Sequence, residues 1–110
     1  MKKVVLENLS IKDLELIQDR VNEKIQVLNS NLWDDMIKID LLQELWFDLR
    51  KKIENTKNSD RNKIIMRVST SIVLMELFLN LIAANTGLNG YESYLLLDLA
   101  GRLNKQIINL

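Results

Sequence analysis

Proline, cysteine and histidine are all absent from this chain of 110 residues. Because no proline interrupts the backbone, long helices can run without losing an amide donor. The absence of cysteine excludes disulfides, thiolate nucleophiles and thiolate zinc sites. The absence of histidine removes the commonest general base and metal ligand, so catalytic triads and zinc sites that need histidine are excluded. We therefore expect a protein that is not an enzyme and that needs no cofactor or metal.

The composition is otherwise that of an ordinary globular domain. Apolar residues make up 47% and charged residues 27%, and 15 basic residues balance 15 acidic ones. A chain of this length buries about two-thirds of its unfolded surface, so residues 1–110 are expected to form one domain. The opening MKKVVLENLS has a run of only three apolar residues before Glu7, too short for a signal peptide, and we expect a cytoplasmic protein. The abundance of isoleucine, asparagine and lysine is typical of AT-rich bacterial or phage genomes.

Apolar residues recur at helical spacing in the first half of the chain. Ser10 and Asp13 form a capping-box pattern, which predicts the start of a first helix that ends near Leu28. The residues NSN at 29–31 break the pattern, and a second helix is expected over residues 32–54. The stripe of this helix that should face the core is Leu32, Met36, Ile39, Leu42, Trp46, Leu49 and Ile53.

Two further helices are expected in the second half. The polar connection ENTKNSD contains Ser59 and Asp60, either of which can cap a third helix that runs to about residue 85. Gly87 fits the left-handed residue that closes a helix. Asn89 can cap a fourth helix that runs close to the C-terminus. Gly101 lies inside this helix, where glycine costs about 1 kcal/mol relative to alanine, which suggests close backbone packing there.

The predicted fold is all-α, a four-helix up-down antiparallel bundle, because short connections favour antiparallel neighbours. The residues KVVL at 3–6 could form a short extended N-terminal lead-in, although a lone strand is marginal without a partner strand. The chain contains no internal repeat and no sign of a second domain.

The apolar stretch at residues 71–97 raises the question of a membrane span. The 21 residues from 64 to 84 are long enough to cross a bilayer. However, a charged residue such as Arg67 or Glu76 costs roughly 2.5 to 3.5 kcal/mol near the centre of a span, which cancels most of the apolar gain. We therefore expect the central helix of a soluble bundle and no membrane span. Its polar residues fall on one narrow stripe: Asn62, Ser69, Glu76 and Asn80.

Residues 82–97, IAANTGLNGYESYLLL, resemble the helix-turn-helix of DNA-binding proteins. Ala83 lies four residues before the turn glycine Gly87, and Leu88 is apolar where the pattern requires it. Two features depart from the pattern. Ser93 replaces a branched apolar residue, and the second helix starts GYESYLLLD, without side chains suited to reading base edges. A glycine-closed helical hairpin uses the same residues and is the alternative interpretation.

Basic residues cluster around the connection between the second and third predicted helices, since seven of the fifteen lie from position 50 to position 67. Such a cluster can contact RNA, DNA or an acidic protein surface, which makes a small nucleic-acid-binding regulator the alternative function. Cations at the end of a helix also complement its dipole, so a purely structural role is the other interpretation. We call this cluster the basic elbow: Arg50, Lys51, Lys52, Lys57, Arg61, Lys63 and Arg67.

A second apolar ridge on the second helix steps by four residues through Trp33, Ile37, Leu41 and Leu45. Two interpretations stay open. The ridge either packs within the bundle, or it is an exposed patch that binds a partner helix or a second copy of the chain. An aromatic anchor inside a charged rim is typical of a protein interface.

The sequence therefore predicts a small protein-binding modulator, such as an inhibitor, adaptor or immunity-type protein, that acts through this ridge. Its partner is another protein, and self-association, most simply as a dimer, is also expected. The carboxylates of Asp40, Glu44 and Asp48 lie beside the ridge. They are interpreted as a solvated helix face rather than as a site for a divalent cation.

Overall fold

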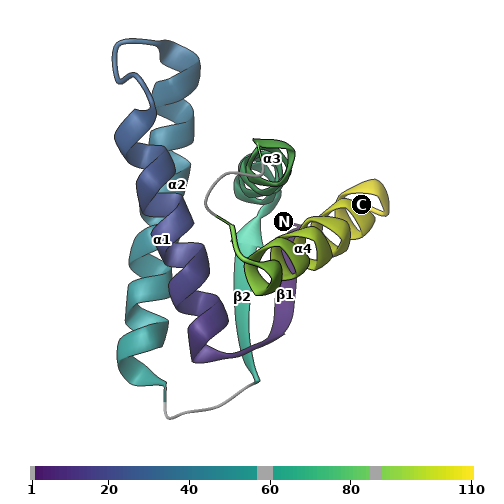
Figure 1. Cartoon of the computed structure of the whole chain (residues 1–110). Coiled ribbons are helices and arrows are strands. Elements are labelled where there is room, and N and C mark those ends of the chain that lie inside the picture. The colour runs from purple at the N-terminus through teal and green to yellow at the C-terminus, as the bar shows by residue number, and fades with distance from the viewer. Residues whose placement is uncertain (1, 57–60, 85–87) are drawn as a thin grey trace.

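The structure is a computed structural model that describes residues 2–56, 61–84 and 88–110, and 75% of the chain is helical. The predicted helical fold with four helices is thereby confirmed. A pure four-helix bundle is not confirmed, because two strands add a small antiparallel sheet. The elements in chain order are β1 (Lys3–Leu9), α1 (Ile11–Val27), α2 (Trp33–Asn55), β2 (Asn62–Arg67), α3 (Val68–Ala84) and α4 (Gly90–Ile108) (Figure 1).

The helices form two pairs that differ in direction. α1 and α2 run side by side as an antiparallel hairpin, whereas α3 is seen end-on in the same view and α4 runs obliquely beside it (Figure 1). α3 packs against each of the other five elements, which makes it the central helix. The arrangement is therefore less regular than an up-down bundle, in which neighbouring helices lie close to antiparallel.

The two strands pair in antiparallel orientation, with Val4 opposite Met66 and Leu6 opposite Ile64. These four side chains lie on one face of the sheet, because alternate residues of a strand face the same side. All four are buried. The register shifts after Leu6, where Asn8 adopts a φ of 58°, in the left-handed region that asparagine tolerates. The expected N-terminal lead-in is therefore a strand with a partner far along the chain.

The prediction of a third helix that begins near residue 60 is wrong for residues 62–67, which form β2. Ile64 and Met66 are buried there while Lys63 and Ile65 are exposed, which is the alternation of a half-buried strand. α3 follows directly after this strand. The expected cap residues and the closing glycine lie outside the described residues: Ser59, Asp60 and Gly87.

The predicted caps of the first and fourth helices are confirmed. The Ser10 hydroxyl accepts a hydrogen bond from the Asp13 amide, and the Ser10 amide donates to the Asp13 carboxylate, both at 3.0 Å. The Asn89 side chain accepts from the Glu92 amide at 2.9 Å. The close packing expected at Gly101 is wrong, because an added Cβ there would find no atom of the described residues outside its own helix within 4 Å.

One side of α3 faces the core, where Leu74 and Phe78 are fully buried, whereas Ile72 and Leu79 are exposed. Glu76 on its polar stripe is exposed and bonds to Lys38 of α2 at 3.0 Å. Asn62, which the sequence pattern assigned to the same stripe, instead belongs to β2 and donates to a carbonyl of β1 at 2.9 Å. Of the helices in the described ranges, none is long and apolar enough to cross a membrane.

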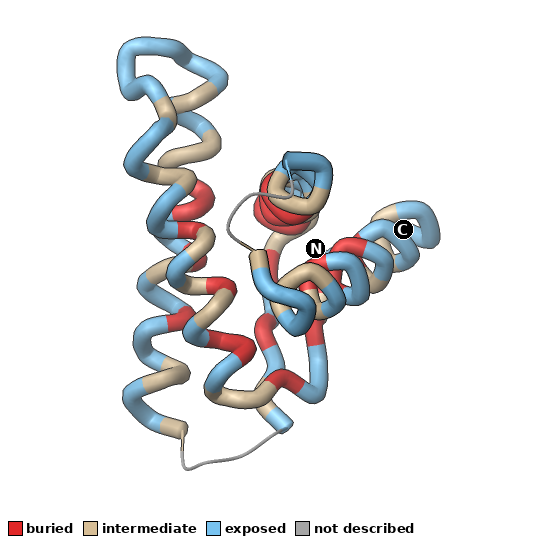
Figure 2. The backbone as a smooth tube through the Cα atoms, viewed as in Figure 1, coloured by how far each residue is buried: buried red, intermediate tan, exposed pale blue. Residues whose placement is uncertain are grey.

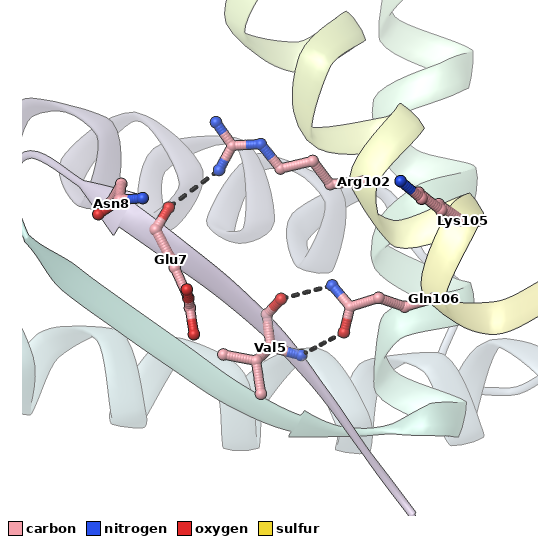
Figure 3. A pocket seen from close by; sticks show the side chains of 6 residues that line it. All are labelled: Val5, Glu7, Asn8, Arg102, Lys105 and Gln106. Atoms are coloured by element: carbon pink, nitrogen blue, oxygen red, sulfur yellow. Dashed lines mark hydrogen bonds between the residues drawn. The ribbon is translucent and has the colours of Figure 1, made fainter. Parts of the chain in front are cut away.

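α4 covers the outer edge of β1. The Gln106 side chain donates to the Val5 carbonyl at 2.6 Å and accepts from the Val5 amide at 2.9 Å (Figure 3). One turn earlier, Arg102 donates to the Glu7 carbonyl at 2.9 Å (Figure 3). These bonds satisfy backbone groups that an edge strand otherwise leaves open.

Candidate interaction surface

The second apolar ridge of α2 is half exposed and half buried. Trp33 and Ile37 are 84% and 61% exposed, whereas Leu41 and Leu45 are 8% and 2% exposed. The first turns of α2 lie at the upper end of the hairpin, where Figure 2 shows mostly exposed residues, and buried residues begin further down. Trp33 and Ile37 are therefore the part of the ridge that a partner can reach, while Leu41 and Leu45 belong to the core.

Other exposed apolar side chains lie at the same end of the hairpin as Trp33 and Ile37. The predicted core-facing stripe of α2 is wrong at its start, since Leu32 and Met36 are more than half exposed. Val27, the last residue of α1, is exposed as well. We call these five exposed side chains the hairpin tip: Val27, Leu32, Trp33, Met36 and Ile37.

The turn between α1 and α2 is held by its own hydrogen bonds. The Asn29 side chain accepts from the Asn31 amide, and the Asn29 amide donates to the Asp35 carboxylate, both at 2.9 Å. The Asn29 carbonyl accepts from the Leu32 amide at 3.1 Å. Because these bonds already order the turn, its backbone has little conformational entropy left to lose on binding a partner.

Acidic side chains flank the hairpin tip. Asp34 and Asp35 lie in the first turn of α2, where carboxylates interact favourably with the helix dipole. The nearby cation, Lys38, is held by Glu76. That hydrogen bond raises the pKa of Lys38 against the opposing effect of partial burial, and Asp35 and Asp34 add to the increase. With Asp40, residues 33–40 carry a net negative charge.

A groove of about 280 Å³ between α1 and α3 adjoins the hairpin tip at Val27. Leu77 and Leu81 of α3 contribute apolar walls, and Arg20 and Lys24 of α1 contribute charged ones. The groove extends the apolar surface of the tip toward the body of the molecule and has room for an anchoring side chain of a partner.

The structure brings part of the basic elbow together. Lys51 and Lys52 of α2 line a groove of about 270 Å³ whose other side includes Ile64 and Ile65 of β2. Two arginines of the elbow have acidic partners, because Arg50 bonds to Glu54 at 3.0 Å and Arg67 bonds to Glu44 at 2.8 Å. Of the remaining members, Lys63 and Arg61 are exposed, and Lys57 lies outside the described residues.

The first turn of α4, which a helix-turn-helix would place in a DNA groove, is bonded to α1. The Tyr91 hydroxyl donates to the Asp13 carboxylate, and Glu92 pairs with Arg20 at 2.5 Å. Burial lowers the pKa of Arg20, but its bonds to Glu92 and Glu23 outweigh this effect and raise the pKa above its usual value. Two of the side chains nearest the helix start are therefore engaged within the molecule.

The three carboxylates of α2 lie along an exposed face, as their spacing predicts. Asp40, Glu44 and Asp48 are all exposed, and Glu44 is the partner of Arg67. Across the described ranges, no three acidic side chains gather into a group that could hold a metal ion.

No protein-family model matches the chain, and no curated protein or solved structure matches it either.

Proposed function

We propose that this protein is a non-enzymatic binding module whose hairpin tip docks on another protein, as an inhibitor, adaptor or immunity-type modulator. One observation supports this function above the others. Five large apolar side chains, including a tryptophan that is 84% exposed, lie at the protruding end of the α1–α2 hairpin. An exposed apolar cluster with a tryptophan anchor and a charged rim is typical of a binding hot spot.

The partner that fits the hairpin tip has an apolar groove bordered by basic residues. Trp33, Met36 and Ile37 are spaced by three and four residues, the spacing with which an amphipathic helix inserts into such a groove. Asp34 and Asp35 beside them favour a basic rim and speed association with it. The same carboxylates would face their own copies in a symmetric dimer, so a different protein is favoured over self-association.

A tip variant and a control of matching exposure test this function. Trp33→Ala combined with Ile37→Ala removes the anchor, whereas Tyr94→Ala combined with Leu97→Ala removes side chains that are 81% and 59% exposed on α4. Each tagged protein is purified from its native cells at low and high salt, with nuclease added. We expect a stoichiometric protein partner that survives both treatments, is lost from the tip variant and is retained by the α4 variant.

Two outcomes would contradict the proposal. Retention of the partner by the tip variant would place the interface elsewhere, and co-purification of nucleic acid only at low salt would favour the regulator alternative. The remaining alternative is that the hairpin tip binds a second copy of the chain. Analytical ultracentrifugation of the pure proteins tests it, because a homodimer would then dissociate in the tip variant alone.

A further inference from the structure

The two outer edges of the β1–β2 sheet differ in what lies beside them. On β1, Gln106 bonds to both backbone groups of Val5, and Arg102 bonds to the carbonyl of Glu7 (Figure 3). On β2, the outer edge borders the groove that contains Lys51 and Lys52. An open strand edge presents unpaired N–H and C=O groups to which another strand can add.

The register of the sheet shows where the backbone of Ile65 points. Val5 lies opposite Ile65, and the bonds of Val5 to Gln106 direct its N–H and C=O away from β2. Opposite residues of an antiparallel pair either bond to each other or both point outward. The N–H and C=O of Ile65 therefore point away from β1, and no partner for either is found among residues 2–56, 61–84 and 88–110.

The groove beside this edge has room and charge for a ligand. Its volume is about 270 Å³. The side chain of Ile65 is half exposed, which provides an apolar contact. Lys51 and Lys52 form no ion pair within the described part of the chain, and one acidic residue opposes them in the groove. The lining is Asp48, Leu49, Lys51, Lys52, Ile64 and Ile65.

We propose that the outer edge of β2 binds an acidic, extended segment of a partner protein as a third strand. Backbone hydrogen bonds to Ile65 hold the segment, and Lys51 and Lys52 pair with its carboxylates. This surface is separate from the hairpin tip and does not depend on the function proposed for it.

The charges and the geometry disfavour other occupants. A second copy that paired its own β2 at this edge would bring Lys51, Lys52 and Lys63 close to the same residues of its partner. A nucleic acid does not carry the alternating N–H and C=O groups that a strand edge binds, and the lining of the groove includes no aromatic ring for base stacking.

The test uses a fluorescein-labelled peptide that alternates valine and glutamate, together with two N-methylated forms. One form carries methyl groups on its odd amides and the other on its even amides, so each blocks one edge of the added strand. We expect one form to lose at least about ten-fold in affinity, or about 1.4 kcal/mol, while the other binds like the parent. The parent peptide should also slow hydrogen exchange at the Ile65 amide, measured by NMR.

Charge reversal on the protein provides a second readout. Lys51→Glu combined with Lys52→Glu should weaken peptide binding by at least about ten-fold, since both ion pairs become repulsive. The control, Lys2→Glu combined with Lys105→Glu, makes the same change of charge at two exposed lysines outside the groove and should leave affinity nearly unchanged. The proposal is overturned by an equal loss with both methylated peptides or by absence of binding at millimolar peptide. Stronger protection of the Ile65 amide by a single-stranded oligonucleotide would also overturn it.

Discussion

Replacement of Trp33 by alanine tests the division of the α2 ridge into an exposed and a buried half. Trp33 keeps 84% of its accessible surface. Folding therefore buries only about a sixth of the roughly 150–250 Å² that a core aromatic residue covers, or about 25–40 Å². At about 25 cal/mol per Å², alanine should lower the free energy of unfolding by less than about 1 kcal/mol. Leu45, which is 2% exposed, is the matched core position, and Leu45→Ala should cost about 2–5 kcal/mol.

Urea denaturation followed by far-ultraviolet circular dichroism measures both changes in the free energy of unfolding. Each protein is measured at two concentrations, because the apparent stability of an oligomer depends on concentration. An effect of Trp33→Ala that appears only at the higher concentration would show that the tip associates with a second copy. A loss as large as that of Leu45→Ala at both concentrations would show that Trp33 is buried within the monomer and would refute its role as a contact.

Three further substitutions test the fold around the two surfaces. Ser10→Ala removes the acceptor of the capping box, and the free energy of unfolding should fall by about 1 kcal/mol in urea denaturation. Gly101→Ala should raise that free energy by up to about 1 kcal/mol, because the new methyl group has no close neighbour outside its helix in the part of the chain that the structure describes. A decrease would reveal a contact at that position. Gln106→Leu leaves both backbone groups of Val5 without their partner, so NMR should show faster hydrogen exchange at the Val5 amide and unchanged exchange at Ile65.

The starts of α1 and α4 were predictable because both sides of a cap lie within one turn of the chain. Ser10 with Asp13, and Asn89 with Glu92, need no tertiary contact to be recognised, and both pairs form the expected bonds. The segment 62–67 carries no comparable local signal. A short apolar run is compatible with a strand or a helix. The choice depends on β1, which lies on the far side of the α1–α2 hairpin in the sequence.

The candidate surfaces were predictable in composition but not in exposure. Spacing revealed a ridge that contains Trp33 and Leu45, yet their burial differs because the first turns of α2 extend past the elements that cover its later turns. Spacing also assigned Leu32 and Met36 to the core, and they are exposed because they too lie in the first turns of α2. The lysines of the basic elbow were evident as a cluster in the sequence. The groove beside Lys51 and Lys52 was not predictable, because it forms against β2 and residues 62–67 were interpreted as helix.

The pairing of β1 with β2 also affects the order in which the chain can fold. The whole α1–α2 hairpin lies between the two strands, and the entropic cost of closing a flexible loop rises with its length. The contacts between α1 and α2 are local, so this hairpin is expected to form early and to shorten the loop that remains. The Gln106 link between α4 and β1 joins residues 101 positions apart and is expected to form later. The hairpin tip is therefore expected to be structured early, and the edge of β1 that Gln106 covers is expected to be completed later.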